Sequence, residues 1–262
     1  MKAKFRSTAL RKQRTNSHTF PDMRKLIYIA LIVTASIIAL KAYETKNARL
    51  HAARSRSEPA IRASFAKVGV SYPAGEVFIR AFKRERELEV WARGDGKFVK
   101  VATFPILAAS GQPGPKRKEG DLQVPEGLYE IDRFNPQSLF HLSLGLNYPN
   151  ASDRILSDHE QPGGDIFIHG KNVTIGCLPM GDEGIEQIYI AATDAKKKPV
   201  KVHVFPARMS GDAWTAFAAE KPALAAFWAQ LQPAYDYFEQ QQMIPDFTVK
   251  PDGVYRITAF PR

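Results

Sequence analysis

Short apolar runs punctuated by glycine and proline begin at Val77 and continue through most of the chain. This pattern predicts β-strands, with candidates at VFIRAF (77–82), RELEVWA (86–92), KFVKVATF (97–104), GLYEI (127–131), LFHLSL (139–144) and DIFIHG (165–170). Gly94-Asp95-Gly96 is typical of a hairpin turn between the second and third of these strands. Val200, Val202 and Val204 alternate with polar residues and predict a further strand.

Helical spacing occurs in two places beyond residue 177. Asp182 is positioned to cap a helix whose apolar residues recur at i, i+3, i+4 and i+7, namely Ile185, Ile188, Tyr189 and Ala192. An aromatic helical region runs from Trp214 to Tyr237, interrupted at Pro222 and Pro233, and a last strand is expected near 254–257. The fold class expected is therefore mainly β with helices (α+β), with a β-rich domain at 73–208 and an α-rich C-terminal extension at 209–262.

Two long loops separate the predicted strands, at residues 110–127 and 146–164. Loops of this length inside a compact domain are usually functional or disordered. They hold Lys116, Lys118 and Arg154, which we interpret as candidate contacts for substrate carboxylates, although charged loop residues are most simply solvated.

A different pattern marks the N-terminus, where Leu26–Leu40 is an uncharged apolar run between Lys25 and Lys41. Eight basic residues precede it, and a basic flank before an apolar run is typical of an export signal whose basic end stays in the cytoplasm. A clean cleavage site is missing, which narrowly favours an uncleaved signal anchor over a signal peptide. We therefore expect a basic cytoplasmic tail (1–25), a signal anchor or signal peptide (26–42), a linker with some helical tendency (43–72), and an exported remainder in the periplasm, held at the inner membrane.

The formal net charge of +10 belongs to the N-terminus. Residues 68–262 hold 22 basic and 24 acidic side chains, so the folded part is close to neutral. A basic nucleic-acid-binding domain is disfavoured on this ground.

Cys177 is the single cysteine, which excludes an intramolecular disulfide and a paired-cysteine zinc or redox site. The six histidines show no metal-ligand spacing, so no metal and no cofactor are expected. In an oxidising compartment a lone thiol is a liability unless it is buried or used. Free cysteine is also among the most buried residue types, so a small core residue is the alternative interpretation.

His169-Gly170 closes a predicted strand, and Cys177 follows eight residues after the histidine. If adjacent strand ends bring imidazole and sulfur together, His169 can accept the thiol proton and return it to a leaving amine. The backbone amides of Gly176 and Cys177 are candidates for an oxyanion hole, and the carbonyl of Gly170 is the nearest group that could orient the imidazole.

The segment IFIHGKNVTIGCLPMGDEGIEQIY resembles the signature of the L,D-transpeptidase catalytic domain (YkuD family), in the form seen in its YafK-like branch. VFIRAFKRERELEVWARGDGKFVKVATFPI, SGQPGPKRKEGDLQVPEGLYEI, HLSLGLNYPNASDR and FWAQLQPAYDYFE resemble further parts of that branch, in consistent order over roughly 75–260. The resemblance implies a β-rich domain in which Cys177 is the nucleophile, His169 the base and Gly176 part of the oxyanion hole.

The family resemblance also implies the substrate, the stem peptide of peptidoglycan attacked at diaminopimelate. Ile175 and Leu178 depart from the commoner family form, which has histidine and arginine there. This departure favours an amidase that releases a covalently attached lipoprotein from the wall, the action associated with the YafK-like branch. Two alternatives stay open: a transpeptidase that forms cross-links or attaches protein, and a non-catalytic wall-binding module. A papain-like protease is disfavoured because its cysteine context is absent.

Overall fold

The structure is a computed structural model that describes residues 23–259. The chain forms two compact units, residues 1–45 and 46–262. Helix α1 (Met23–Lys67) begins in the first unit and ends in the second. Most of the predicted basic tail, residues 1–22, lies outside the described residues.

The first unit contains the apolar run, whose large side chains at Leu31, Ile32 and Ile38 are exposed to solvent. Among the residues that the structure describes, no helix is long and apolar enough to cross a membrane. The transmembrane helix expected within 26–42 is therefore not found there. The run is fifteen residues long between Lys25 and Lys41, whereas a comfortable span takes about 20 residues.

The second unit begins with the rest of α1, because residues 43–67, expected to be mostly linker, continue the helix. This stretch is rich in alanine and arginine, which have high helix propensity. Every fourth residue then lies on one buried face: Ala53, Ser57, Ile61 and Phe65. The helix is thus an integral part of the folded domain from about Ala53 onward.

The domain is built on an eight-stranded sheet with the strand order β3-β2-β1-β8-β4-β5-β6-β7. Its strands are β1 (Val77–Phe82), β2 (Glu87–Arg93), β3 (Phe98–Pro105), β4 (Gly127–Asn135), β5 (Ser143–Leu146), β6 (Phe167–His169), β7 (Leu178–Pro179) and β8 (Lys201–Phe205). Neighbouring strands are antiparallel except for β1–β8 and β6–β7, which are parallel.

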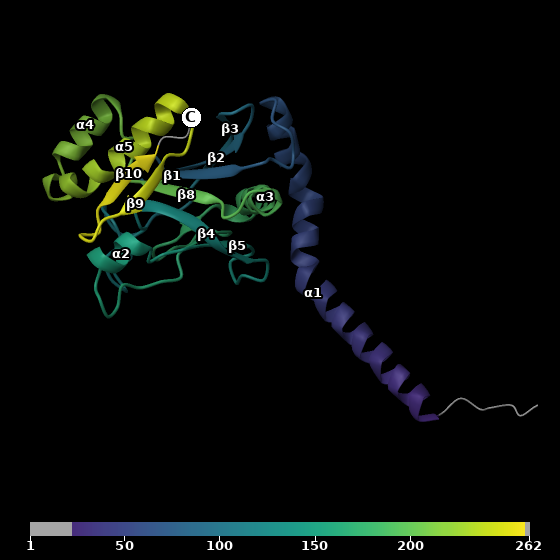
Figure 1. Ribbon diagram of the computed structural model, residues 1–262. Coiled ribbons are helices and arrows are strands. Elements are labelled where there is room, and N and C mark those ends of the chain that lie inside the picture. Colours follow the sequence, from purple (N-terminus) through teal and green to yellow (C-terminus); the bar gives the residue numbers. More distant parts are fainter. Residues whose placement is uncertain (1–22, 260–262) are drawn as a thin grey trace, which may run out of the picture. The chain divides into compact units, whose positions relative to one another are not determined.

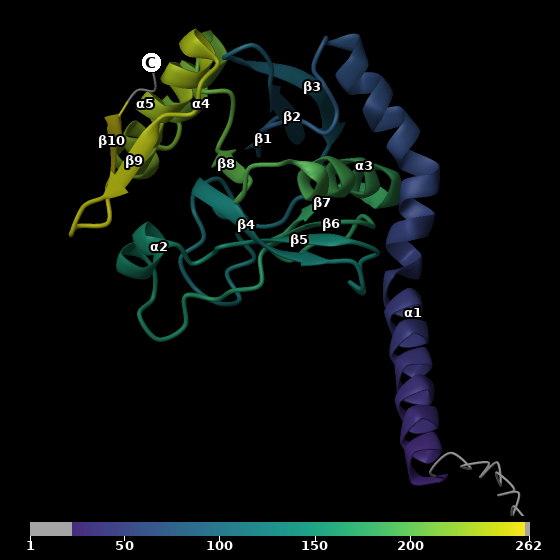
Figure 2. The same ribbon diagram turned by 45° about the vertical axis from the view of Figure 1, so that its right-hand side comes forward.

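Both faces of the central strands are covered, which follows from the alternation of side chains along a strand. Val77, Ile79 and Ala81 of β1 pack in the larger core with α3 (Gly181–Asp194), whereas Phe82 packs on the opposite face against α5 (Ala225–Gln241). Figures 1 and 2 show β8 between these two helices. This double burial explains why β1 reads as a continuous apolar run interrupted by Arg80 alone.

The C-terminal extension consists of α4 (Gly211–Ala219), a 3-10 turn η1 (Pro222–Leu224), α5, and a hairpin of β9 (Asp246–Val249) and β10 (Tyr255–Ala259). The expected mostly β fold with an α-rich extension is confirmed. Pro233 does not interrupt the last helix as predicted but lies inside α5, whose buried residues Trp228, Leu231 and Phe238 hold it on the sheet.

Three local expectations differ from the structure. Residues 139–142, predicted as strand, form a turn before β5, and the two-residue strand β7 was not predicted. Asp182 does not cap α3: the N-cap is Met180, and the Asp182 carboxylate instead accepts a hydrogen bond from the amide of Lys171 at 2.9 Å.

Candidate active site

Strand register places His169 and Cys177 on the same face of the sheet. Ile168 of β6 pairs with Leu178 of β7, and both side chains lie in the core shared with α3. Alternation then directs Phe167, His169 and Cys177 to the opposite face. The imidazole and thiol predicted to work together therefore line one cavity, which the short parallel pairing of β6 and β7 creates.

His169 is 2% exposed, and its ring is oriented by the next residue. Nδ1 lies 2.6 Å from the carbonyl oxygen of Gly170. Because a carbonyl can only accept, Nδ1 carries the proton and Nε2 keeps its lone pair. Burial lowers the pKa of His169, so the ring is a neutral base at neutral pH. The contact expected between His169 and Gly170 is thus present.

A turn at residues 138–142 packs against this histidine. The Phe140 ring lies 4.7 Å from the imidazole centre, and the amide of Gly170 donates to the carbonyls of Phe140 and Leu142 at 3.0 and 3.2 Å. No larger residue fits at Gly170, since a Cβ would lie 2.7 Å from the Phe140 carbonyl oxygen.

The 138–142 turn is held on its other side by α1 and α3. Arg49 of α1 donates to the carbonyls of Ser138 and His141 at 2.6 and 2.7 Å. The His141 ring lies 2.7 Å from the carboxylate of Glu186 on α3, which also accepts from Ser57 at 2.6 Å. The orientation of the His169 ring therefore depends on contacts with both helices.

Cys177 is half-buried, and its sulfur lies 3.6 Å from the carbonyl oxygen of Asp165. Burial raises the pKa of the thiol and the Asp165 carboxylate raises it further, while Phe167 and Lys116 act in the opposite direction. Both shifts favour the uncharged forms, so a neutral thiol and a neutral imidazole line the same cavity. Such a pair needs the base to remove the proton as the sulfur attacks.

The tight turn before Cys177 is organised by the hydroxyl of Thr174. It accepts from the amides of Gly176 and Cys177 at 3.2 and 2.7 Å, and donates to the carbonyl of Cys177 at 2.8 Å. Gly176 adopts φ +133°, and a Cβ there would lie 3.0 Å from the carbonyl oxygen of Gln123. Both features explain why glycine and threonine stand at these positions.

In the turn before Cys177, the two amides expected to form an oxyanion hole already have a hydrogen-bond partner. The two amides do converge on one oxygen atom, which is the geometry that an oxyanion requires. That atom is the Thr174 hydroxyl, however, so the amides are already bonded in this state. For these amides to bind a substrate oxyanion, the Thr174 hydroxyl must first release them.

Cys177 stands where two cavities meet. A polar cavity of about 670 Å³ extends under the long loops and is lined by residues such as Lys116, Glu119 and Glu160. An apolar cavity of about 500 Å³ extends the other way, lined by Leu139, Phe140, Phe167, Val173 and Thr174 together with His169. Asp165, Ile175 and Cys177 line both.

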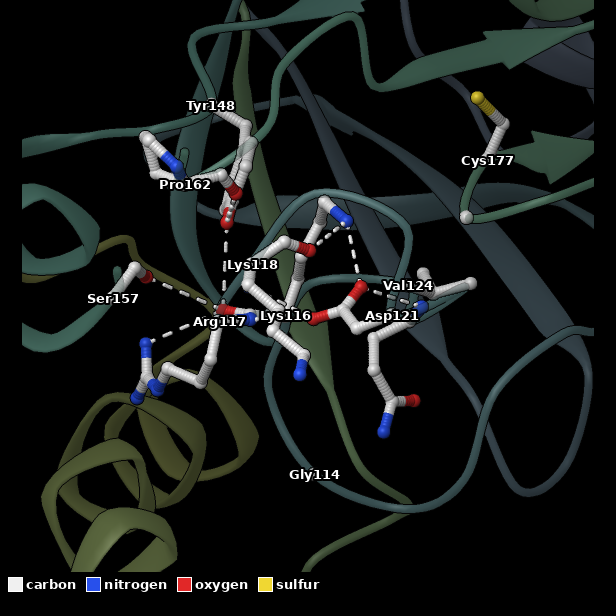
Figure 3. A network of polar contacts seen from close by, with 12 residues as sticks. Gly114, Lys116, Arg117, Lys118, Asp121, Val124, Tyr148, Ser157, Pro162 and Cys177 are labelled. Carbon is white, nitrogen blue, oxygen red and sulfur yellow. Dashed lines mark hydrogen bonds and ion pairs between the residues drawn. The ribbon is translucent and has the colours of Figure 1, made fainter. Parts of the chain in front are cut away.

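The three loop cations predicted as substrate contacts are placed differently from one another. Lys116 is buried and lines the polar cavity, where its ammonium contacts Asp121 at 2.6 Å and the Lys118 carbonyl at 2.8 Å (Figure 3). The exposed side chains of Lys118 and Arg154 line neither cavity at Cys177.

Ile175 and Leu178, the two departures from the commoner family form, lie in different surroundings. Ile175 is 78% exposed at the junction of the cavities, whereas Leu178 is 1% exposed in the core. Neither brings charge to the site.

Thr174, Phe140 and Asp165 are the site residues that the sequence analysis did not predict. The one available signal was the hydroxyl three residues before the cysteine. In the described part of the chain, no three His, Cys, Asp or Glu side chains gather to hold a metal ion.

Comparisons with known proteins agree with this geometry. Residues 76–204 match the L,D-transpeptidase catalytic domain of the YkuD family. The chain is 34% identical over 178 residues to an Escherichia coli (strain K12) protein provisionally named L,D-transpeptidase YafK, a match that covers 66% of this chain and 70% of that protein.

Solved structures show weaker likeness. The helical cell shape determining protein Pgp2 from Campylobacter jejuni is 24% identical with a TM-score of 0.42, over 56% of this chain and 55% of that one. Bd1075 from Bdellovibrio bacteriovorus is 21% identical with a TM-score of 0.38, over 65% and 63%. The match to Pgp2 thus spans little more than half of that chain.

Cys177 and His169 both lie within the matched residues 76–204. The similarity to the Escherichia coli relative covers 70% of that protein. The chain belongs to the L,D-transpeptidase (YkuD) family, a family of cysteine enzymes that act on the stem peptides of peptidoglycan.

Proposed function

We propose that the protein is an exported amidase that cleaves an amide at diaminopimelate of the stem peptide and releases a covalently attached lipoprotein. The observation that carries the proposal is the placement of Cys177 and His169 on one face, with Cys177 at the junction of two cavities. Ile175 at that junction and Leu178 in the core supply neither the imidazole nor the guanidinium of the commoner family form.

The geometry supports a two-step reaction. His169 Nε2 takes the thiol proton as the sulfur attacks the amide carbonyl, and the oxyanion is stabilised by the amides of Gly176 and Cys177. The intermediate collapses to a thioester as His169 returns the proton to the leaving amine. His169 then deprotonates water, which attacks the thioester and leaves a free carboxylate on the stem peptide and the thiol on Cys177.

Water is favoured over an amine as the second nucleophile by what surrounds the cysteine. A transferase must hold an acceptor amine in line, which takes charged or hydrogen-bonding groups beside the acyl-enzyme. Ile175 supplies neither, and Leu178 is buried away from the site.

Transpeptidation is the second candidate, and the apolar cavity favours it. Leu139, Phe140 and Val173 surround the approach to the sulfur on the His169 side. An apolar wall slows hydrolysis of an acyl-enzyme by excluding water.

Product analysis separates the candidates. Peptidoglycan carrying bound protein is incubated with the enzyme, with and without excess diaminopimelate-containing acceptor, and the products are identified by mass. Hydrolysis predicts released protein and a free stem-peptide carboxylate, insensitive to acceptor. Cross-linked dimers that increase with acceptor would establish a transferase. If the wild-type enzyme yields no more product than the Cys177→Ala control, the result would point to a wall-binding module.

We also propose that residues after the apolar run face the periplasm, with the N-terminus held at the inner membrane. The support is the group of eight basic residues before Leu26, which holds that end in the cytoplasm. A reporter fused after Arg262 that works only when exported should be active. Activity from a reporter that works only in the cytoplasm would overturn the location.

A further inference from the structure

We infer that the apolar cavity beside His169 receives the leaving half of the substrate, and that this half is a polypeptide with a large apolar or aromatic side chain close to its attachment point. The inference rests on the proposed amidase function and assigns a side of the site to each half of its substrate. It names a binding site and the chemistry of its occupant.

The position of the base decides which half lies where. Proton return to the leaving amine requires that amine within hydrogen-bond reach of His169 Nε2. His169 lines the apolar cavity and not the polar one, while Cys177 lines both. The scissile bond lies at Cys177, so the amine side of that bond extends into the apolar cavity.

The acyl half then occupies the polar cavity, and the charges there agree. A stem peptide that ends in diaminopimelate carries carboxylates and an ammonium group. The polar cavity is lined by Lys116, whose ammonium already contacts Asp121, and by the exposed carboxylates of Glu119 and Glu160, which can receive the diaminopimelate ammonium. No lysine or arginine is among the residues that line the apolar cavity, and Asp165 is acidic, so substrate carboxylates would find no counter-charge there.

The lining of the apolar cavity specifies the leaving half more closely. Leu139 is 87% exposed, Ile175 78% and Val173 54%, and the Phe140 ring is fixed against His169. Large apolar side chains gathered in one exposed place mark a binding site. Water or a small amine would be too small to fill a cavity of about 500 Å³. An amino-acid side chain such as phenylalanine or leucine, carried by the departing polypeptide, fills it.

Cleavage of two matched substrates tests the inference on the full chain. Each is a stem tripeptide joined through diaminopimelate to the lysine of Gly-Phe-Gly-Lys or of Gly-Ala-Gly-Lys. We expect kcat/KM to be about tenfold higher for the phenylalanine substrate. Leu139→Ser and Val173→Ser should bring the ratio towards one. Leu107→Ser, a matched control at an exposed leucine outside both cavities, should leave the ratio unchanged.

A binding arm does not depend on turnover. Free Gly-Phe-Gly-Lys should protect Cys177 from iodoacetamide at about tenfold lower concentration than Gly-Ala-Gly-Lys, and Leu139→Ser should abolish the difference. Equal cleavage of both substrates would overturn the inference and leave the amidase function intact. Better protection by a stem tripeptide or a fatty acid than by the phenylalanine peptide would assign the cavity to another occupant. Protection without cleavage would show that the cavity binds an apolar peptide side chain, but it would count against the amidase and so against the assignment of that peptide as the leaving half.

Discussion

At the scale of single residues, burial makes the His169 imidazole a weaker base and the Cys177 thiol a weaker acid. Burial lowers the pKa of His169 and raises that of Cys177, so neither group is charged at rest. The resting site is therefore not a Cys177 thiolate paired with a His169 imidazolium. A thiol that stays protonated at rest is a poorer nucleophile than a thiolate, which limits side reactions of Cys177.

Asp165→Asn tests how the surroundings set the reactivity of the thiol. The Asp165 carboxylate raises the pKa of Cys177, so its removal should lower that pKa and increase the thiolate fraction near neutral pH. We expect iodoacetamide to react about twofold faster, a modest gain because the carboxylate is exposed and screened. Asp132→Asn is the matched control, since it also removes a partner of Arg133. Equal acceleration in both variants would assign the effect to Arg133.

Thr174→Val tests the hydroxyl that organises the nucleophile turn. Valine keeps the shape but leaves the amides of Gly176 and Cys177 without their partner, so the sulfur loses its fixed position. We expect kcat to fall about tenfold with KM little changed, and Thr174→Ser to restore it. A valine variant as fast as the wild type, or faster, would mean that the hydroxyl merely competes with the oxyanion.

The sequence was sufficient to predict that His169 and Cys177 come together at adjacent strand ends and that His169 contacts the Gly170 carbonyl, because both are local features. It was insufficient for Thr174, whose hydroxyl occupies the two amides, because that depends on the conformation of the turn. Lys118 and Arg154 were chosen by charge alone, and a loop residue's charge does not determine which way its side chain points.

At the scale of elements, helix α1 contacts the 138–142 turn, which packs against His169, the proposed base. Arg49→Gln should loosen that turn, expose the His169 ring and raise its pKa towards the ordinary value. Because His169 must be neutral to act as a base, the acid limb of the pH–kcat profile should move to higher pH. Arg54→Gln is the control: it breaks an ion pair between α1 and Asp194 of α3, without touching the turn. It should cost stability of about 1 kcal/mol and leave the limb in place. Identical profiles for wild type and Arg49→Gln would contradict this coupling.

Elements with strong periodicity could be predicted from the sequence, and those set by tertiary contacts could not. The spacing of Ile185, Ile188 and Tyr189 identified α3 because each residue faces the core. Residues 139–142 have strand-like composition but form a turn, since Arg49 of α1 binds the His141 carbonyl and Glu186 of α3 contacts the His141 ring. Pro233 is tolerated inside α5 because packing on the sheet outweighs its local preference.

At the scale of the whole molecule, a buried arginine links the C-terminal extension to the sheet. Arg80 is 1% exposed, contacts Glu239 of α5 at 2.6 Å, and lies 4.6 Å from the ring centre of Phe238. Its Nε and one terminal nitrogen have no hydrogen-bond partner, although they are buried. Burial lowers the pKa of this guanidinium, so the charge is costly where it lies.

Arg80→Met should therefore be close to neutral for the free energy of unfolding, since methionine keeps the apolar contacts and removes two unpaired donors. Glu89→Gln should destabilise by about 3 kcal/mol, because it leaves Arg80 and Arg208 without a buried counter-charge. Denaturant unfolding monitored by tryptophan fluorescence measures both. A larger loss in Arg80→Met than in Glu89→Gln would reverse this ranking.

Intact-mass analysis of the quenched enzyme tests the chemistry at Cys177 most directly. After brief mixing with a stem peptide carrying an amide at diaminopimelate, the protein should gain the mass of the acyl half on Cys177, while the amine half appears free. Cys177→Ala should gain no mass, and His169→Gln should gain it more slowly. Release of the amine half without an adduct, at equal rates in wild type and Cys177→Ala, would contradict nucleophilic catalysis by this cysteine.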